Sequence, residues 1–296
     1  KGVDFVLFLP RAERYNVERY AIDLPIRYRL PRRALQMTIL NAWRYALPAN
    51  VRGFDLVHSL LDFPYCFCAA YSAFVFGKPL ITGSQGTYGV LPLTRSPDRQ
   101  LLLWTYRRAK RIIVPSAFTR DQIWQHAGER FPIDVIHNGV NTARFSKTVD
   151  ASAVRAKFAG KKILLTVGGI KHRKGQDIVI RAMAELRTRG RNDIVYVIVG
   201  DGIQKDEFQA LARQLGVDDR VAFEGGKTGD ALLTYFRAAD VYVHTPRVYH
   251  LNFEGFGIVY LDASMGRLPI VATDAGGIRD AVIDGETGLI AADEDV

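Results

Sequence analysis

Strand-like and helix-like segments alternate along almost the whole chain of 296 residues, and this alternation constrains the fold more than any other feature. Short runs rich in valine, isoleucine and leucine are separated by stretches whose apolar residues have helical spacing, such as Ile178, Ala182 and Leu186. Parallel strands need crossover connections, and helices usually supply them. The sequence therefore predicts an α/β fold with doubly wound parallel sheets.

The predicted elements fall into two groups. Strands are expected over residues 3–9, 54–59, 79–83, 111–115 and 133–137, and then over 162–167, 194–199, 220–223, 241–244, 269–272 and 289–290. Helices are expected over 33–47, 62–76, 96–109 and 117–127, and then over 176–189, 204–215, 229–238, 257–265 and 277–282. Ser116 is a plausible N-cap of the helix over 117–127.

The polar stretch over 141–150 predicts a linker between two domains, one of residues 1–145 and one of residues 146–296. The chain is long enough for two domains of ordinary size. Ligands of open α/β sheets bind outside the carboxyl ends of the strands. Two such domains facing each other would leave a cleft, and we expect the active site there.

The positive charge is concentrated in the first half of the chain. The net charge is +9, but residues 1–150 carry 21 Lys and Arg against 11 Asp and Glu, whereas residues 151–296 carry 19 against 20. Much of the excess lies in arginines interleaved with aromatic residues: Arg11, Arg14, Arg19, Arg27, Arg29, Arg32, Arg33 and Arg44. This mixture suits an anionic membrane surface, although a solvated helix face over core aromatic residues would give the same pattern. No nucleic-acid-binding motif appears, so no nucleic acid partner is expected.

The sequence also bears on location. No apolar run is long enough to span a bilayer and no signal peptide is visible, so we expect a cytoplasmic protein that can lie on the inner face of the membrane. Cys66 and Cys68 are one residue apart, which is poor spacing for a disulfide and leaves no partners for a zinc site. Both are predicted to be buried thiols in a reducing compartment.

One segment sets two carboxylates around a glycine-flanked loop, in the order Phe253-Glu254-Gly255-Phe256-Gly257-Ile258-Val259-Tyr260-Leu261-Asp262. A helix is predicted from Gly257 onward. Its first N–H groups and its positive dipole end would face a ligand in front of the loop, and the natural ligand there is an anion such as a phosphate. The two glycines allow a close approach. Glu254 and Asp262 would flank the anion, which suits the hydroxyls of a sugar and a ribose on either side of a diphosphate.

This segment resembles the E-x7-E signature of the family 4 retaining glycosyltransferases, which have the GT-B fold, except that the second Glu is Asp262 here. Further stretches are similar to landmarks of that family in the same order: residues 136–141, 167–170, 173–175, 199–202, 267–278 and 285–290. The resemblance covers nearly the whole chain. It implies two Rossmann-like domains facing across a cleft, with the acceptor on the N-terminal side. It also implies that an opening strand, a glycine-rich loop and a helix, as well as a C-terminal helical tail, are missing from this sequence.

The resemblance assigns roles in donor binding. Glu254 matches the Glu that contacts the donor sugar, and Asp262 matches the Glu that binds ribose hydroxyls. The backbone amides of Phe256, Gly257 and Ile258, next to Gly255, are expected to hold the diphosphate or the sugar.

Positive charge for the leaving diphosphate is expected from side chains and helix dipoles, because no convincing D-x-D motif stands at a strand end to hold a divalent ion. Lys174 matches the family's phosphate-binding Lys. Without the resemblance, Lys171-His172-Arg173-Lys174 would be interpreted as a basic surface loop. The family has an Arg directly after the first Gly of this segment, where this chain has Gly169. The sequence leaves open whether Arg173 or Lys171 compensates.

Two further positions follow from the resemblance. Lys227 lies in the loop after the strand over 220–223 and is expected to contact the base or the ribose. Gln85 stands where the family has a His that contacts the donor sugar or the acceptor. Glutamine can donate and accept hydrogen bonds but cannot take a proton, and a plain surface-loop residue is the alternative. Retaining members need no strong protein base, since the leaving phosphate can take the acceptor proton.

The sequence thus predicts a retaining, metal-independent glycosyltransferase that moves a sugar from a UDP- or GDP-sugar to a lipid-linked or cell-envelope glycan. Catalytic roles fall to Glu254, Lys174 and Gln85, and no cofactor is expected. One alternative is a non-catalytic nucleotide-sugar-binding subunit or pseudoenzyme, because Gly169, Gln85 and Asp262 depart from the family pattern. Another is an epimerase or phosphorylase of the same fold.

Overall fold

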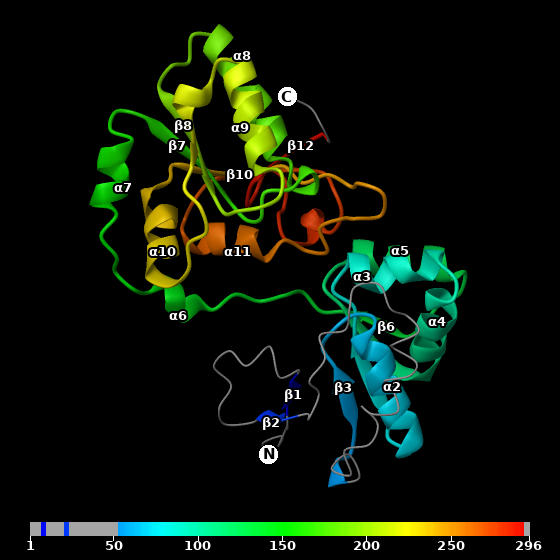
Figure 1. Ribbon diagram of the computed structural model, residues 1–296. Coiled ribbons are helices and arrows are strands. Elements are labelled where there is room, and N and C mark those ends of the chain that lie inside the picture. Colours follow the sequence, from blue (N-terminus) through cyan, green and yellow to red (C-terminus); the bar gives the residue numbers. More distant parts are fainter. Residues whose placement is uncertain (1–6, 10–20, 24–52, 293–296) are drawn as a thin grey trace. The chain divides into compact units, whose positions relative to one another are not determined.

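The computed structural model describes residues 7–9, 21–23 and 53–292, and the chain forms two compact units (Figure 1). The first unit takes residues up to Ser84 together with Pro92–Ile113 and Ile123–Asp134. The second unit takes Gln85–Leu91, Val114–Gln122 and Val135–Val296. The helix predicted over 33–47 and the eight arginines between Arg11 and Arg44 lie outside the described residues.

The first unit is built on a parallel sheet. Its strands follow the order β3 (Val57–Ser59), β4 (Leu80–Gly83), β5 (Ala109–Val114) and β6 (Ile133–Val135). The helices along this part of the chain are α2 (Tyr65–Val75), α3 (Thr87–Val90), α4 (Asp98–Arg108) and α5 (Ala117–Ala127). A separate parallel pair joins β1 (Leu7–Leu9) to β2 (Ala21–Asp23).

Two sequence predictions about this part of the chain are confirmed. The Thr119 amide donates to Ser116 Oγ at 3.1 Å, so Ser116 caps α5. Cys66 and Cys68 are free, buried thiols on α2. Burial raises the pKa of both thiols, which keeps them protonated and unreactive at neutral pH.

The second unit is built on a larger parallel sheet with the strand order β12-β11-β10-β7-β8-β9. These strands are β7 (Lys162–Val167), β8 (Ile194–Val199), β9 (Val221–Phe223), β10 (Val241–His244), β11 (Ile270–Thr273) and β12 (Leu289–Ala291). The helices are α6 (Thr142–Phe145), α7 (Ser152–Lys157), α8 (Gln176–Thr188), α9 (Lys205–Gln214), α10 (Gly229–Ala238) and α11 (Ile258–Met265).

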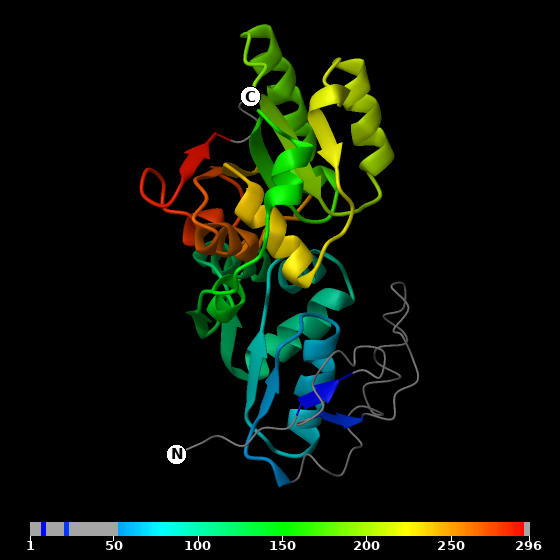
Figure 2. The same cartoon turned by 90° about the vertical axis from the view of Figure 1, so that its left-hand side faces the viewer.

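Helices cover both faces of this sheet, as Figures 1 and 2 show. Successive strand residues point to opposite faces. Val197 therefore packs in the core that includes α10 and α11, whereas its neighbours Tyr196 and Ile198 pack in the core that includes α8 and α9. All three side chains are fully buried. Burying such a side chain contributes about 1.5–3 kcal/mol, so both faces stabilise the strands whose carboxyl ends carry the polar residues described below.

The structure differs from the sequence predictions at two places. The stretch over 141–150, predicted as a linker, contains α6, and Phe145 is buried in the core of the second unit. The helix predicted over 277–282 is wrong, because this segment forms only the one-turn 3₁₀ helix Ile278–Asp280. A new turn begins at once, since the Ile283 amide donates to Thr287 Oγ1 at 2.8 Å.

In the part of the chain that the structure describes, every helix is too short or too polar to cross a lipid bilayer.

Candidate functional site

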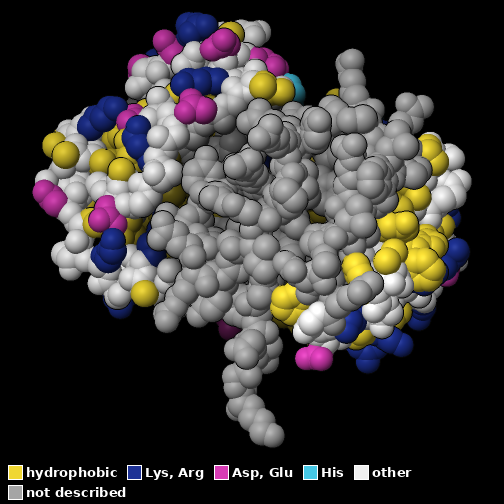
Figure 3. Space-filling view, turned by 60° about the horizontal axis from the view of Figure 1, so that its bottom comes forward, with side chains coloured by type: hydrophobic (Ala, Val, Ile, Leu, Met, Phe, Trp, Pro, Cys, Tyr) yellow, Lys and Arg dark blue, Asp and Glu magenta, His cyan; other side chains and the backbone are white. Residues whose placement is uncertain are grey.

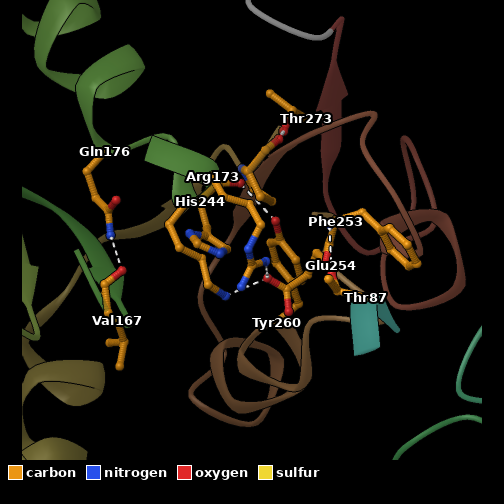
Figure 4. Close-up of polar contacts among 12 residues, drawn as sticks. Thr87, Val167, Arg173, Gln176, His244, Phe253, Glu254, Tyr260 and Thr273 are labelled. Atoms are coloured by element: carbon orange, nitrogen blue, oxygen red, sulfur yellow. Dashed lines mark hydrogen bonds and ion pairs between the residues drawn. The ribbon is translucent and has the colours of Figure 1, made fainter. Parts of the chain in front are cut away.

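The central feature of the candidate site is a carboxylate held by two cations. Lys174 and Arg173 lie on the 3₁₀ helix His172–Lys174 that follows β7, and Glu254 lies in the loop before α11. Figure 4 shows the side chains of Arg173 and Glu254 in contact. Oxygen Oε2 of Glu254 is 2.5 Å from Lys174 Nζ and 3.0 Å from Arg173 Nη1. The side chains of Glu254, Lys174 and Arg173 are only 16%, 17% and 25% exposed. The structure therefore brings together three of the residues predicted for donor binding.

Electrostatics keep Glu254 ionised. Burial opposes the charged carboxylate, but the charge of Lys174, reinforced by its hydrogen bond and by Arg173, outweighs burial and lowers the pKa of Glu254 below the usual 4.5. Lys174 and Arg173 carry two positive charges against the single negative charge of Glu254, so this cluster of three side chains has a net positive charge.

Residues 171–175, here called the cationic loop, are hydrogen-bonded to the residues that follow β10. Thr245 Oγ1 donates to the carbonyl oxygen of Gly175 at 2.7 Å, and the Arg247 amide donates to the Arg173 carbonyl at 3.0 Å. The Arg247 guanidinium also pairs with both carboxylate oxygens of Asp177 on α8, at 2.5 and 2.6 Å. These contacts fix the backbone that carries Lys174 and Arg173.

Replacing Gly175 with alanine should lower the free energy of unfolding by about 2–4 kcal/mol. Gly175 has a left-handed φ of 71°, and a Cβ there would lie 1.7 Å from the Thr245 carbonyl oxygen. Gly190→Ala is the matched control, because Gly190 has φ 75° with nothing within 4 Å of an added Cβ. In the control, the free energy of unfolding should fall by only about 1–2 kcal/mol, which is the cost of a left-handed backbone at a residue with a Cβ. Urea unfolding measures both, and equal losses in the two variants would contradict the close packing at Gly175.

The start of α11 presents backbone donors. Gly257 precedes α11 with φ 85°, and a Cβ there would lie 2.6 Å from the Tyr260 ring, so glycine is required. Among the described residues, the amides of Gly255, Phe256, Gly257 and Ile258 donate no hydrogen bond to another group of the protein. Phe256 is buried, with its ring 5.5 Å from that of His137. Unpaired N–H groups at a helix N-terminus favour an anion.

Residues from the N-terminal half of the sequence pack against the Glu254 loop within the second unit. Thr87 Oγ1 donates to the Phe253 carbonyl at 3.2 Å and accepts from the Phe253 amide at 3.1 Å. A Cβ on Gly255 would lie 2.0 Å from the carbonyl oxygen of Gln85. Gln85 is exposed and lies beside the loop through its backbone, so its predicted role stays a prediction.

Asp262 lies on α11 and is 16% exposed. Burial raises the pKa of Asp262, and the nearby Arg144 charge opposes that shift. Arg144 Nη1 is 3.8 Å from Asp262 Oδ1. Sequence reasoning missed Arg144 because it lies on α6, inside the stretch predicted as a linker.

Lys171 lies beside Gly169, the position at which the family pattern has an Arg. A Cβ on Gly169 would lie 3.8 Å from Lys171 Cε and 3.7 Å from the Asp201 carbonyl oxygen. Arg173, by contrast, is paired with Glu254. Lys171 is exposed and makes no ion pair with any residue that the structure describes. Lys171 is therefore the cation that approaches the space beside Gly169.

Lys227 is placed differently from the central cluster. Its Nζ donates to the carbonyl oxygen of Glu224 at 2.6 Å, within the loop after β9. Its charge also helps to lower the pKa of Asp201, after the hydrogen bonds of Asp201 to Lys205 and Gly226. A contact of Lys227 with the base or ribose stays a prediction.

His244 is a second residue that sequence reasoning missed. It ends β10 and is completely buried. The signal that could have found it is its position, since a polar residue at the carboxyl end of a buried parallel strand stands where ligands of such sheets bind.

No group of three or more His, Cys, Asp or Glu placed to hold a metal ion occurs within residues 53–292 as the structure describes them.

Comparison with known proteins identifies the family. Residues 1–144 match the family described as "Glycosyltransferase Family 4", and residues 150–296 match "Glycosyl transferases group 1". The chain belongs to the family 4 glycosyltransferases. Solved glycosyltransferases share its fold, so the predicted GT-B architecture of two Rossmann-like parallel sheets is confirmed.

Two relatives and one solved structure show what this chain is similar to. The GDP-mannose-dependent alpha-(1-6)-phosphatidylinositol monomannoside mannosyltransferase of Mycolicibacterium smegmatis is 32% identical over 72% of this chain and 56% of its own length. The D-inositol 3-phosphate glycosyltransferase of Nocardia farcinica is 33% identical over 62% of this chain and 41% of its own. HepE of Anabaena, solved in complex with UDP, superposes with a TM-score of 0.72 at 24% identity, over 87% of this chain and 68% of that one. The chain thus spans about half the length of these curated relatives.

Proposed function

We propose that this family 4 glycosyltransferase transfers a sugar from a nucleotide-diphosphate sugar with retention of configuration and without a metal ion. The observation that carries the proposal is the Glu254 carboxylate held by Lys174 and Arg173, directly before the unpaired amides of residues 255–258 at the start of α11. The cations and amides would bind the diphosphate, and the carboxylate would accept hydrogen bonds from the sugar.

The charge of the cationic loop supports a metal-free diphosphate site. Lys171, Arg173 and Lys174 lie within four residues; Arg173 and Lys174 share one carboxylate, Glu254, whereas Lys171 makes no ion pair with any residue that the structure describes. The surplus of positive charge complements the charge that develops on a leaving diphosphate. Charge-assisted hydrogen bonds from Lys and Arg to phosphate oxygens are among the strong ones in proteins.

In the proposed reaction, the bond between the anomeric carbon and the diphosphate oxygen breaks and the diphosphate leaves with the electron pair. The acceptor hydroxyl forms its bond on the same face of the sugar, and its proton passes to an oxygen of the leaving phosphate. Glu254 holds a sugar hydroxyl while charge grows at the anomeric carbon. Gln85 supplies a hydrogen bond only, since an amide cannot take the proton. Asp262 would receive the ribose hydroxyls, with Arg144 beside it.

The relatives support the choice of donors to test. The mycolicibacterial relative is named for GDP-mannose, and HepE was solved with UDP-glucose. We therefore propose a GDP- or UDP-hexose as the donor. The same relative is named for phosphatidylinositol monomannoside, which supports a lipid-linked or cell-envelope glycan as the acceptor.

We also propose that the first unit contacts an anionic membrane. Figure 3 shows hydrophobic side chains gathered over part of this unit, with Lys and Arg nearby. Phe74 and Val75 of α2 are 53% and 50% exposed, and the Arg108 guanidinium lies 4.2 Å from the Phe74 ring centroid. Aromatic and basic side chains together suit the interface of anionic lipids.

The protein should co-sediment with phosphatidylglycerol vesicles and less with phosphatidylcholine vesicles, and Phe74→Ser should weaken binding. Equal sedimentation with both lipids would oppose the proposal.

Thermal stability with nucleotides tests the proposed function. A ligand at about 100 times its dissociation constant adds about 2.7 kcal/mol of stability. We expect GDP or UDP to raise the melting temperature, ADP to have less effect, and EDTA to leave the shift unchanged. A shift that EDTA abolishes would refute metal independence. The absence of any nucleotide shift in the full-length protein would refute donor binding.

Removing the cation at position 171 and placing one at position 169 should test whether Lys171 helps to bind the phosphate. Lys171→Ala should weaken GDP or UDP binding about 3- to 10-fold, because an exposed cation near a phosphate contributes about 1 kcal/mol. Gly169→Arg in the Lys171→Ala background should restore affinity, since a side chain at 169 starts beside the space that Lys171 occupies. Isothermal titration calorimetry measures both. Unchanged affinity in Lys171→Ala would exclude Lys171 from the site.

A further inference from the structure

His244 is a buried polar side chain that the proposed reaction does not yet use. It has no exposed surface, and neither ring nitrogen has a hydrogen-bond partner among the described residues. Burial, followed by the charge of Lys174, lowers the pKa of His244 to about 3, although Glu254 opposes the shift. The ring is therefore neutral at working pH, with one N–H donor and one acceptor nitrogen. A buried polar group without a partner is costly, so a role for these nitrogens is expected.

The aromatic neighbours of His244 do not satisfy its nitrogens. The Tyr260 ring lies 5.6 Å away, and its hydroxyl donates to the carbonyl of His244 itself at 2.9 Å. The Tyr242 ring lies 6.3 Å away, and its hydroxyl donates to the Val167 carbonyl. The charged groups whose fields reach His244 are Lys174, Glu254 and Arg173. Figure 4 shows the imidazole beside this cluster.

Glu254 has room for another donor. Both cations contact its oxygen Oε2, and Oε1 has no hydrogen bond to any residue that the structure describes. A diphosphate would attract Lys174 and Arg173 because it carries more negative charge than one carboxylate. Glu254 would then lose donors while remaining largely buried, and a buried carboxylate needs hydrogen bonds to stay ionised.

We propose that His244 is a positioning residue for Glu254: its imidazole N–H donates to the Glu254 carboxylate when Lys174 and Arg173 turn to the donor diphosphate. This inference rests on the proposed function. The hydrogen bond holds Glu254 oriented toward the sugar while the cations bind the leaving group. His244 does not touch the nucleotide, so it should affect the rate of transfer and not the binding of the nucleoside diphosphate.

Two substitutions separate this role from a structural one. His244→Phe keeps a planar ring against Tyr260 but removes both nitrogens, whereas His244→Gln keeps one donor and one acceptor. The assays on the full-length protein are the melting temperature, the dissociation constants of GDP and UDP, and kcat for release of the nucleoside diphosphate from GDP-mannose and UDP-glucose with water as acceptor.

We expect His244→Phe to melt at the wild-type temperature or above, because it removes two unpaired buried nitrogens. GDP or UDP should bind within 2-fold of wild type, and kcat should fall about 10- to 100-fold, which corresponds to losing one hydrogen bond to a charged group. His244→Gln should recover most of the rate. In a Glu254→Gln background, His244→Phe should have little further effect, because both act through one contact.

Other outcomes would overturn the inference. An unchanged kcat in His244→Phe, or full additivity with Glu254→Gln, would refute it while leaving the proposed function intact. Equal losses of rate and melting temperature in His244→Phe and His244→Gln would assign His244 a structural role. A measurement on the wild type is independent of folding of the variants: the imidazole N–H proton resonance should move downfield when GDP or UDP is added, and a fixed resonance would refute the hydrogen bond. If wild type neither binds GDP or UDP nor releases them from the sugar nucleotides, the proposed function fails and this inference fails with it.

Discussion

Glu254→Gln should reduce kcat for sugar transfer about 100- to 1,000-fold, the range seen when one preorganised polar group is removed from an active site. The same substitution should leave binding of GDP or UDP unchanged or make it tighter. Glutamine removes the negative charge that Lys174 and Arg173 share at 2.5 and 3.0 Å. Both cations then become more available to a diphosphate.

A lower transfer rate together with unchanged or tighter nucleotide binding would distinguish the loss of a catalytic group from damage to the fold, which would lower both the rate and the affinity. Calorimetry with GDP and UDP and a transfer assay with the matching sugar nucleotide measure the two quantities. Asp274→Asn is the matched control, because Asp274 pairs with Arg279 at 2.7 Å on the exposed surface of the same unit. The control should keep wild-type rate and affinity. A Glu254→Gln protein that transfers sugar at the wild-type rate would remove Glu254 from the catalytic group.

The same carboxylate should make stability depend on pH. The pKa of Glu254 in the folded protein lies below the 4.5 of an unperturbed Glu. Its contribution is therefore fully present above pH 4.5 and is lost as the pH falls through the folded-state pKa. The melting temperatures of wild type and Glu254→Gln should differ at pH 7 and converge in acid. A constant difference down to pH 3 would contradict the ion pair.

Lys174→Ala should weaken binding of GDP or UDP about 10- to 100-fold, because one hydrogen bond to a charged group contributes about 1.5–3 kcal/mol. The transfer rate should fall as well, since the lysine also stabilises charge on the leaving diphosphate. Lys174 is only 17% exposed, so bulk water cannot readily replace its ammonium group. Calorimetry and the transfer assay again measure both.

Lys147→Ala is the control for the loss of a positive charge. Lys147 pairs with Asp230 at 2.9 Å, and both side chains are more than half exposed. Its removal should change neither affinity nor rate, because exposed ion pairs contribute little. If Lys174→Ala bound nucleotide as tightly as Lys147→Ala, the phosphate would have to lie elsewhere.

Much of the second unit could be predicted from local sequence. Buried parallel strands are continuous apolar runs, so the bounds predicted for 162–167, 194–199 and 241–244 coincide with β7, β8 and β10. The helix over 229–238 coincides with α10. Short elements were missed because their signal is weak. Helix α6 has only four residues in a polar stretch, and it is held by the burial of Phe145.

The site was predictable as a set of residues but not as a set of contacts. The motif around Glu254 and the basic run ending at Lys174 are visible in the sequence. Their pairing across 80 positions depends on how β7 and β10 lie side by side in the sheet. For the same reason, the sequence could not decide between Arg173 and Lys171, because only the fold places Arg173 on Glu254 and Lys171 beside Gly169. His244 has no motif at all and is recognised by burial and by its charged neighbours.

The Glu254 loop is backed by pieces of chain that are remote in sequence. Thr87 bonds the backbone of Phe253, and Ser116 lies so close to Gly277 that a Cβ there would approach its hydroxyl to 2.5 Å. Chimeras that join halves of two relatives near residue 145 would separate this loop from the residues that support it. Exchange of donor preference between family members should therefore succeed only if the segments 85–91 and 114–122 are transplanted together with the C-terminal half.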